Sequence, residues 1–194
     1  GLMALELDRL EEAQQLLQRG HELGSDRFGS LEWLEFLIAE RTNSGVEVAR
    51  RLAQRRDLPP DLSCAVRTSL MFDALMDGRF DEARQRAEAL LDIENDSRAE
   101  AVLWALALRA GDAVGIKEHD ARIELPPAHK CYYQFLGSLA VGARVEAEKA
   151  LNALRTYDAA LAERAVAEIR RRESAHVVDD AAVRSGPAGG DHGA

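Results

Sequence analysis

Side chains that commonly carry catalysis are scattered in this sequence. The histidines are His21, His119, His129, His176 and His192. None of them belongs to an HExxH motif or a Ser/His/Asp signature, and neither a GxGxxG nor a GxxxxGK[ST] phosphate loop is present. Carboxylate pairs such as Glu11-Glu12 and Asp179-Asp180 are typical of solvated surface, because general acid–base catalysis needs a buried pocket that shifts a pKa. We therefore expect no enzyme activity, no metal and no cofactor.

Two other groups of reactive or charged side chains have simple interpretations. Cys64 and Cys131 lack CxxC or Cys/His spacing, which favours buried small hydrophobic side chains over a metal site or a disulfide. A basic run contains Arg50, Arg51, Arg55 and Arg56. The run is either an anionic docking patch or a solvated helix face, and charge runs on helices usually serve solvation. In the second case its partners are acidic residues upstream, namely Glu32, Glu35, Glu40 and Glu47.

Composition predicts an all-α protein. Of the 194 residues 46% are hydrophobic, and Ala, Leu, Glu and Arg dominate while aromatic residues are scarce. The formal net charge is −9, with −8 in residues 1–100, which argues against nucleic acid as a partner. No apolar run approaches the roughly 20 residues that span a bilayer. Glu6 and Asp8 interrupt the first apolar residues, so we expect no signal peptide and a cytoplasmic location, in a chain that is an excerpt from a longer protein.

One six-residue phrase recurs along the chain. A turn-forming or polar residue is followed by a polar stretch that leads to an alanine, and the phrases end at Ala13, Ala49, Ala83, Ile116 and Ala147. These ends are 36, 34, 33 and 31 residues apart. Three of the phrases begin with a glycine, at Gly78, Gly111 and Gly142, where a left-handed residue is expected to end a helix. The small alanine then allows two helices to cross closely.

The spacing predicts antiparallel helix pairs followed by a polar-faced capping helix. Ser44 and Ser97 are predicted N-caps, with Glu47 and Glu100 at the third helical position. A helical repeat domain is predicted over residues 1–175, with a truncated first repeat, and a disordered tail over residues 176–194. The predicted helices are Leu2–Leu7, Leu10–Leu23, Leu31–Arg41, Val46–Arg56, Leu62–Met76, Phe80–Leu91, Arg98–Ala110, Ala113–Glu124, Ala128–Val141, Arg144–Arg155 and Ala159–Ser174.

These phrases resemble the tetratricopeptide repeat, whose period is about 34 residues and in which a turn glycine precedes a crossing alanine by five positions. The resemblance covers residues 1 to about 155, in divergent repeats where Ile116 replaces the crossing alanine. It implies an α-solenoid of about five helix pairs. It also implies a protein-interaction scaffold that binds a peptide or protein segment in a concave groove. The alternative is a regulatory or substrate-presenting helical domain of a larger enzyme or transcription regulator.

The register of that family implies which residues line the groove. They are Leu34, Ile38, Arg41, Thr68, Phe72, Met76, Arg98, Arg109, His129 and Tyr132. This surface is apolar in the early repeats and carries Arg, His and Tyr later. We therefore expect it to hold an apolar segment with a nearby acidic group.

Overall fold

The computed structural model describes residues 9–24, 30–42, 44–94, 96–167 and 169–170 as helices joined by short turns, and these residues contain no strand. The all-α class is confirmed. The helices are α2 (Leu10–Glu22), α3 (Ser30–Arg41), α4 (Gly45–Leu52), α5 (Pro60–Met76), α6 (Phe80–Glu94), α7 (Ser97–Ala110), α8 (Ala113–Arg122), α9 (Pro127–Ala140) and α10 (Arg144–Tyr157). Residues 159–167 are also helical. In these described parts, no helix is long and apolar enough to cross a membrane.

The three turn glycines end their helices as predicted. Gly78, Gly111 and Gly142 have φ angles of 73°, 70° and 76°, a region that residues with a Cβ rarely adopt. The amide after each glycine bonds back to a carbonyl five residues earlier, which is the Schellman arrangement. These bonds run from Arg79 to Ala74 (2.8 Å), from Asp112 to Ala107 (3.0 Å) and from Ala143 to Ser138 (2.8 Å). The chain therefore reverses in the same way after α5, α7 and α9.

Small buried residues lie where paired helices cross. The predicted crossing alanines, Ala13, Ala49, Ala83 and Ala147, are all almost fully buried. Between α7 and α8 the crossing residue is Gly115, one position before the partly exposed Ile116. A Cβ at Gly115 would lie 2.5 Å from Oδ2 of Asp112 and 3.2 Å from the Cβ of Ala107, so glycine avoids crowding both the N-cap of α8 and the crossing with α7.

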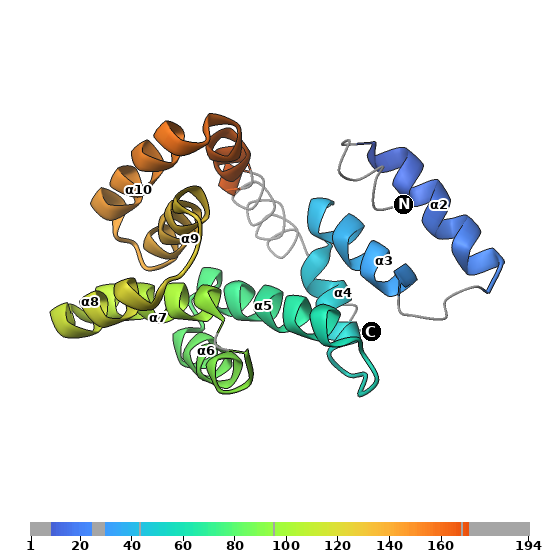
Figure 1. Cartoon of the computed structure of the whole chain (residues 1–194), viewed down its shortest axis with the longest axis horizontal. Helices are drawn as coiled ribbons and strands as arrows, with labels where there is room; N and C mark the ends of the chain where they lie inside the picture. Colours follow the sequence, from blue (N-terminus) through green and yellow to red (C-terminus); the bar gives the residue numbers. More distant parts are fainter. Residues whose placement is uncertain (1–8, 25–29, 43, 95, 168, 171–194) are drawn as a thin grey trace, which may run out of the picture.

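Helix α5 holds the helices together, since it contacts α4, α6, α7 and α9. Figure 1 shows α5 across the middle of the molecule, with α9 and α10 rising at one of its ends and α2 and α3 at the other. Helices that follow one another in the chain also pack together, as in α3 with α4, α7 with α8 and α9 with α10. The predicted helix Leu2–Leu7, the end of the predicted capping helix and the tail 176–194 lie outside the described residues.

Of the two predicted N-cap residues, Ser44 has its predicted position and Ser97 does not. Ser44 is the N-cap residue of α4, but its side chain makes no capping hydrogen bond. Asp96, rather than Ser97, is the N-cap residue of α7, and its carboxylate accepts the N–H of Arg98. The prediction for Ser97 was wrong by one residue because Asp and Ser cap helices about equally well, so their adjacent positions compete.

The basic run on and just after α4 forms ion pairs with its acidic neighbours. Arg51 pairs with Glu35 at 2.6 Å, and Arg55 pairs with Glu32 and Asp57. Arg50 lies 3.0 Å from the largely buried carboxylate of Asp73, which also contacts Arg79. The predicted partners Glu32 and Glu35 are therefore found.

Both cysteines are free thiols. Cys64 is buried, as expected. Cys131 is only partly buried, which corrects the prediction for that residue, and burial raises the pKa of its thiol above the ordinary value.

The crossing alanines predict a position-specific effect on stability. Ala83→Leu adds a bulky side chain where α6 meets α5, and should lower the free energy of unfolding by about 1–3 kcal/mol through overpacking. Ala89→Leu, at an exposed position of the same helix, should change it by less than about 0.5 kcal/mol. Urea titration followed by circular dichroism measures both values. Equal effects of the two substitutions would contradict the crossing assignment.

Candidate functional site

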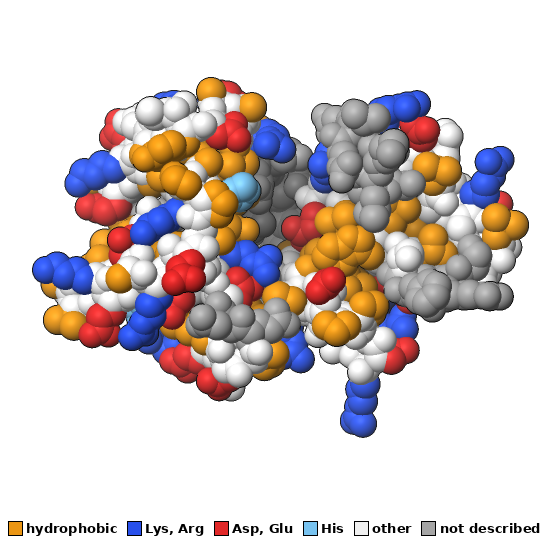
Figure 2. Space-filling view, viewed as in Figure 1, with side chains coloured by type: hydrophobic (Ala, Val, Ile, Leu, Met, Phe, Trp, Pro, Cys, Tyr) orange, Lys and Arg blue, Asp and Glu red, His pale blue; other side chains and the backbone are white. Residues whose placement is uncertain are grey.

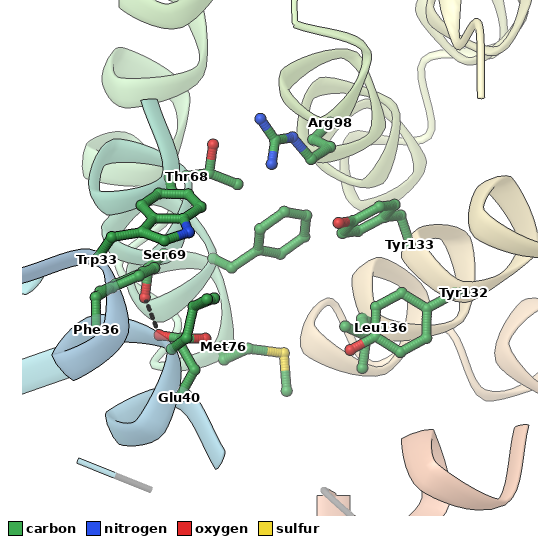
Figure 3. Close-up of a pocket in the computed structure, with 13 residues that line it drawn as sticks. Trp33, Phe36, Glu40, Thr68, Ser69, Met76, Arg98, Tyr132, Tyr133 and Leu136 are labelled. Atoms are coloured by element: carbon green, nitrogen blue, oxygen red, sulfur yellow. Dashed lines mark hydrogen bonds between the residues drawn. The ribbon is translucent and has the colours of Figure 1, made fainter. Parts of the chain in front are cut away.

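A cavity of about 380 Å³ opens between α3, α5, α9 and the start of α7. We call it the aromatic cavity. Figure 3 shows Trp33, Phe36 and Glu40 on one side and Tyr132, Tyr133 and Leu136 on the other. Its lining residues are Trp33, Phe36, Leu37, Glu40, Ala65, Thr68, Ser69, Phe72, Met76, Arg98, Tyr132, Tyr133 and Leu136.

Helix α5 forms the wall between the two sides. Thr68, Phe72 and Met76 are spaced four residues apart and therefore lie on one face of this helix. The sequence placed these three residues on the inner surface, and they do line the cavity. Ala65 and Ser69 also line the cavity but were not predicted, although each lies three residues before a predicted residue and therefore on the same side of the helix.

Helix α3 presents a different face to the cavity from the one predicted. Leu34 and Ile38 are buried in a cluster with Ala13 of α2, so they do not line the cavity. Trp33 and Leu37, each one residue earlier, line it instead. One residue rotates a helix face by about 100°, and the packing of α2 on α3 decides which apolar face turns inward. The prediction for Leu34 and Ile38 is therefore corrected.

Aromatic side chains gather at this cavity. The chain has five Phe, two Trp and three Tyr, and five of these ten residues line it. The rings of Phe72 and Tyr133 stack with centroids 5.1 Å apart, and the rings of Tyr132 and Tyr133 meet edge to face at 5.2 Å. Such contacts join α5 to α9 across the cavity wall. Tyr132 was predicted here, and Tyr133 was missed although it is the next residue.

Arg98 is held by the residue that caps its own helix. Its Nε donates to both carboxylate oxygens of Asp96 at 2.9 and 3.0 Å, and its Nη2 donates to Oδ2 at 2.7 Å. Cys64 and Thr68 donate to the same carboxylate at longer distances of 3.6 and 3.4 Å. The Asp96 side chain is 8% exposed and that of Arg98 is 31% exposed, so the pair is partly shielded from water.

The contacts between Arg98 and Asp96 shift both pKa values. Burial alone would raise the pKa of Asp96, but the hydrogen bonds and charge of Arg98 lower it below the ordinary value. Hydrogen bonding to Asp96 raises the pKa of Arg98. Arg98 therefore lines the cavity as predicted, but its charge is already offset by a carboxylate.

The remaining predicted basic residues lie outside the cavity lining. Arg109 places its guanidinium 3.9 Å from the centroid of the Phe80 ring at the start of α6. His129 is exposed in the first turn of α9, and Arg41 is exposed at the end of α3. None of the three lines the cavity. The repeat register did not predict their absence from the lining, because all three residues lie near the ends of their helices, beyond the part of each helix that encloses the cavity.

The acidic residue of the lining is Glu40. Its Oε1 accepts a hydrogen bond from the Ser69 hydroxyl at 2.8 Å, which connects α3 to α5 at the rim of the cavity. Figure 2 shows hydrophobic side chains gathered near the middle of the molecule, with acidic side chains beside them. The cavity therefore combines aromatic rings, a thioether, one exposed carboxylate and the guanidinium that Arg98 shares with Asp96, a mixture of apolar and polar groups of the kind found in ligand pockets.

The Asp96–Arg98 pair predicts a pH-dependent contribution to stability. Asp96→Asn keeps an oxygen for the cap but removes the charge, and should cost about 1–3 kcal/mol near neutral pH. The folded-state pKa of Asp96 lies below its unfolded value of 3.8, so the stabilisation is complete above that pH and is lost as the pH falls through the folded value. Urea midpoints at about pH 7 and about pH 3 should show a difference that shrinks in acid. The exposed Asp92→Asn serves as control, and a difference independent of pH would contradict the pairing.

Comparisons with known proteins give no assignment for this cavity. No protein-family model matches the chain, and searches of curated proteins and of solved structures found no match. The function proposed next therefore rests on the residues of the chain itself.

Proposed function

We propose that this chain is a protein-interaction module, an α-solenoid similar to tetratricopeptide repeats, that binds a peptide or protein segment in the aromatic cavity. The role is binding rather than catalysis. The single observation that carries the proposal is the concentration of half of the aromatic side chains around one cavity, in a chain where they are scarce. Aromatic side chains dominate the energetics of protein interfaces.

The contacts between successive helices support a solenoid, in which α5 also contacts α9 two helix pairs further along the chain. Helices α5 and α7 are in contact, as are α7 and α9, while α6 and α8 each pack beside the helix that precedes them in the chain. In such a stack, alternate helices line one surface and their partners line the other. The glycine turns recur with the same hydrogen bonds, which supports a repeated unit in the α5–α10 region.

The dimensions of the cavity suit a side chain of a partner rather than a large cofactor. Its volume of about 380 Å³ lies at the lower end of the range for ligand pockets. Its walls come from helices that are distant in sequence, and the Phe72–Tyr133 stack fixes two of them relative to each other. A preformed cavity of this kind lowers the entropic cost of binding.

Peptide display tests this function directly. We expect a random peptide library panned on the full chain to yield sequences that bind it. Ala65→Trp should abolish this binding, because the larger side chain fills the cavity from the α5 wall. Titration of a selected peptide into each variant by calorimetry measures the effect.

The matched control is Val145→Trp, which adds the same side chain at an exposed position of α10 outside the cavity. It should leave the peptide affinity unchanged. Thermal unfolding checks that both variants fold. Selected peptides that bind Ala65→Trp as tightly as the original chain would show that the aromatic cavity is not the binding site.

A further inference from the structure

We infer that the aromatic cavity accepts a cationic side chain, lysine or arginine, flanked by apolar residues in the bound segment. The inference rests on the proposed function and specifies the chemistry of its partner. It reverses the sign of charge expected from the sequence, which placed Arg98, Arg109 and His129 on the binding surface.

The aromatic rings of the cavity favour a cationic side chain. A cation is attracted to the negative face of an aromatic ring, most strongly to that of tryptophan. Trp33 and Tyr132 lie on opposite sides of the cavity. Phe72 of α5 also lines it. The aliphatic part of a lysine or arginine side chain would pack against Met76 and Leu136 while its charged end remains near the rim.

The charged residues at the cavity also favour a cationic side chain. Glu40 presents an exposed carboxylate at the cavity, oriented by the Ser69 hydroxyl. Arg98, the basic residue of the lining, donates three hydrogen bonds to Asp96. The charge of Arg98 is thus offset by Asp96 behind the lining, and Glu40 supplies the exposed negative charge at the cavity. The first hundred residues, which supply α3, α5 and Arg98, carry a net charge of −8 and extend this preference for cations to longer range.

An acidic guest fits these contacts less well. To bind a carboxylate, Arg98 would have to share or give up its bonds to Asp96, which would leave a largely buried carboxylate without its charged partner. Arg109, the other arginine expected to attract an acidic group, lies over Phe80 and outside the lining. A carboxylate entering the cavity would also approach Glu40.

Three capped pentapeptides of the form Ala-Leu-Xaa-Leu-Ala test the inference, with lysine, norleucine or glutamate at Xaa. Norleucine keeps the aliphatic part of lysine and removes the charge. The full chain is titrated with each peptide up to millimolar concentration, and amide chemical shifts are followed by NMR. We expect the lysine peptide to bind roughly 5- to 30-fold more tightly than the norleucine peptide, from about 1–2 kcal/mol of cation–ring and carboxylate attraction.

Glu40→Gln distinguishes the contribution of the carboxylate to peptide binding from that of the rings. Glutamine keeps an oxygen that accepts the hydrogen bond from the Ser69 hydroxyl and removes only the charge. The substitution should weaken the lysine peptide about two- to fivefold, the contribution of an exposed ion pair, and leave the norleucine peptide unchanged. Glu88→Gln, at an exposed position of α6 outside the cavity, should affect neither peptide.

Each other outcome overturns the inference in a recognisable way. Equal or tighter binding of the norleucine peptide would show that the cavity binds an apolar side chain and has no preference for a cation. Tightest binding of the glutamate peptide would show that the cavity prefers an acidic side chain, with Arg98 as its partner. If none of the three peptides binds, the cationic guest is rejected. Failure of the library selection as well would reject the proposed function with it.

Discussion

The position of the aromatic cavity depends on one close contact between helices, where Gly137 of α9 meets Ala105 of α7. A Cβ at Gly137 would lie 2.8 Å from the Cβ of Ala105, which is closer than side chains tolerate. Glycine therefore allows α9 to lie directly on α7. Tyr133 is one helical turn before Gly137 on α9, and this approach carries its ring onto Phe72 of α5.

Helix α5 serves the core and the cavity with different faces. Leu62, Val66 and Leu70 are buried in a cluster with α3 and α4, while Met71 and Leu75 belong to a second cluster with α6 and α7. The third face carries Thr68, Phe72 and Met76 toward the cavity. Because both other faces are packed, the α5 wall of the cavity has little freedom to move, and the cavity is preformed.

Features set by local chemistry were predicted well from the sequence, and features set by tertiary packing were not. The left-handed turn at Gly78 follows from glycine alone, and the burial of Ala83 follows from its distance to that turn. Helix α3 is apolar on two faces, so spacing could not decide between Leu34 and Trp33; the packing of α2 made that choice. Arg98 was expected on the inner surface, but its charge partner, Asp96, was not recognised although it lies only two residues earlier, because the N-cap was assigned to Ser97 instead.

Nuclear Overhauser contacts between a bound peptide and the aromatic rings test the central claim most directly. A lysine-containing peptide with labelled side chains would be added to the full chain. Our account predicts contacts from the lysine methylenes to the rings of Trp33 and Tyr132, on opposite sides of the cavity. Contacts confined to Val66 and Leu90, which line a separate cavity of about 280 Å³ between α5, α6 and the segment that follows α4, would contradict it.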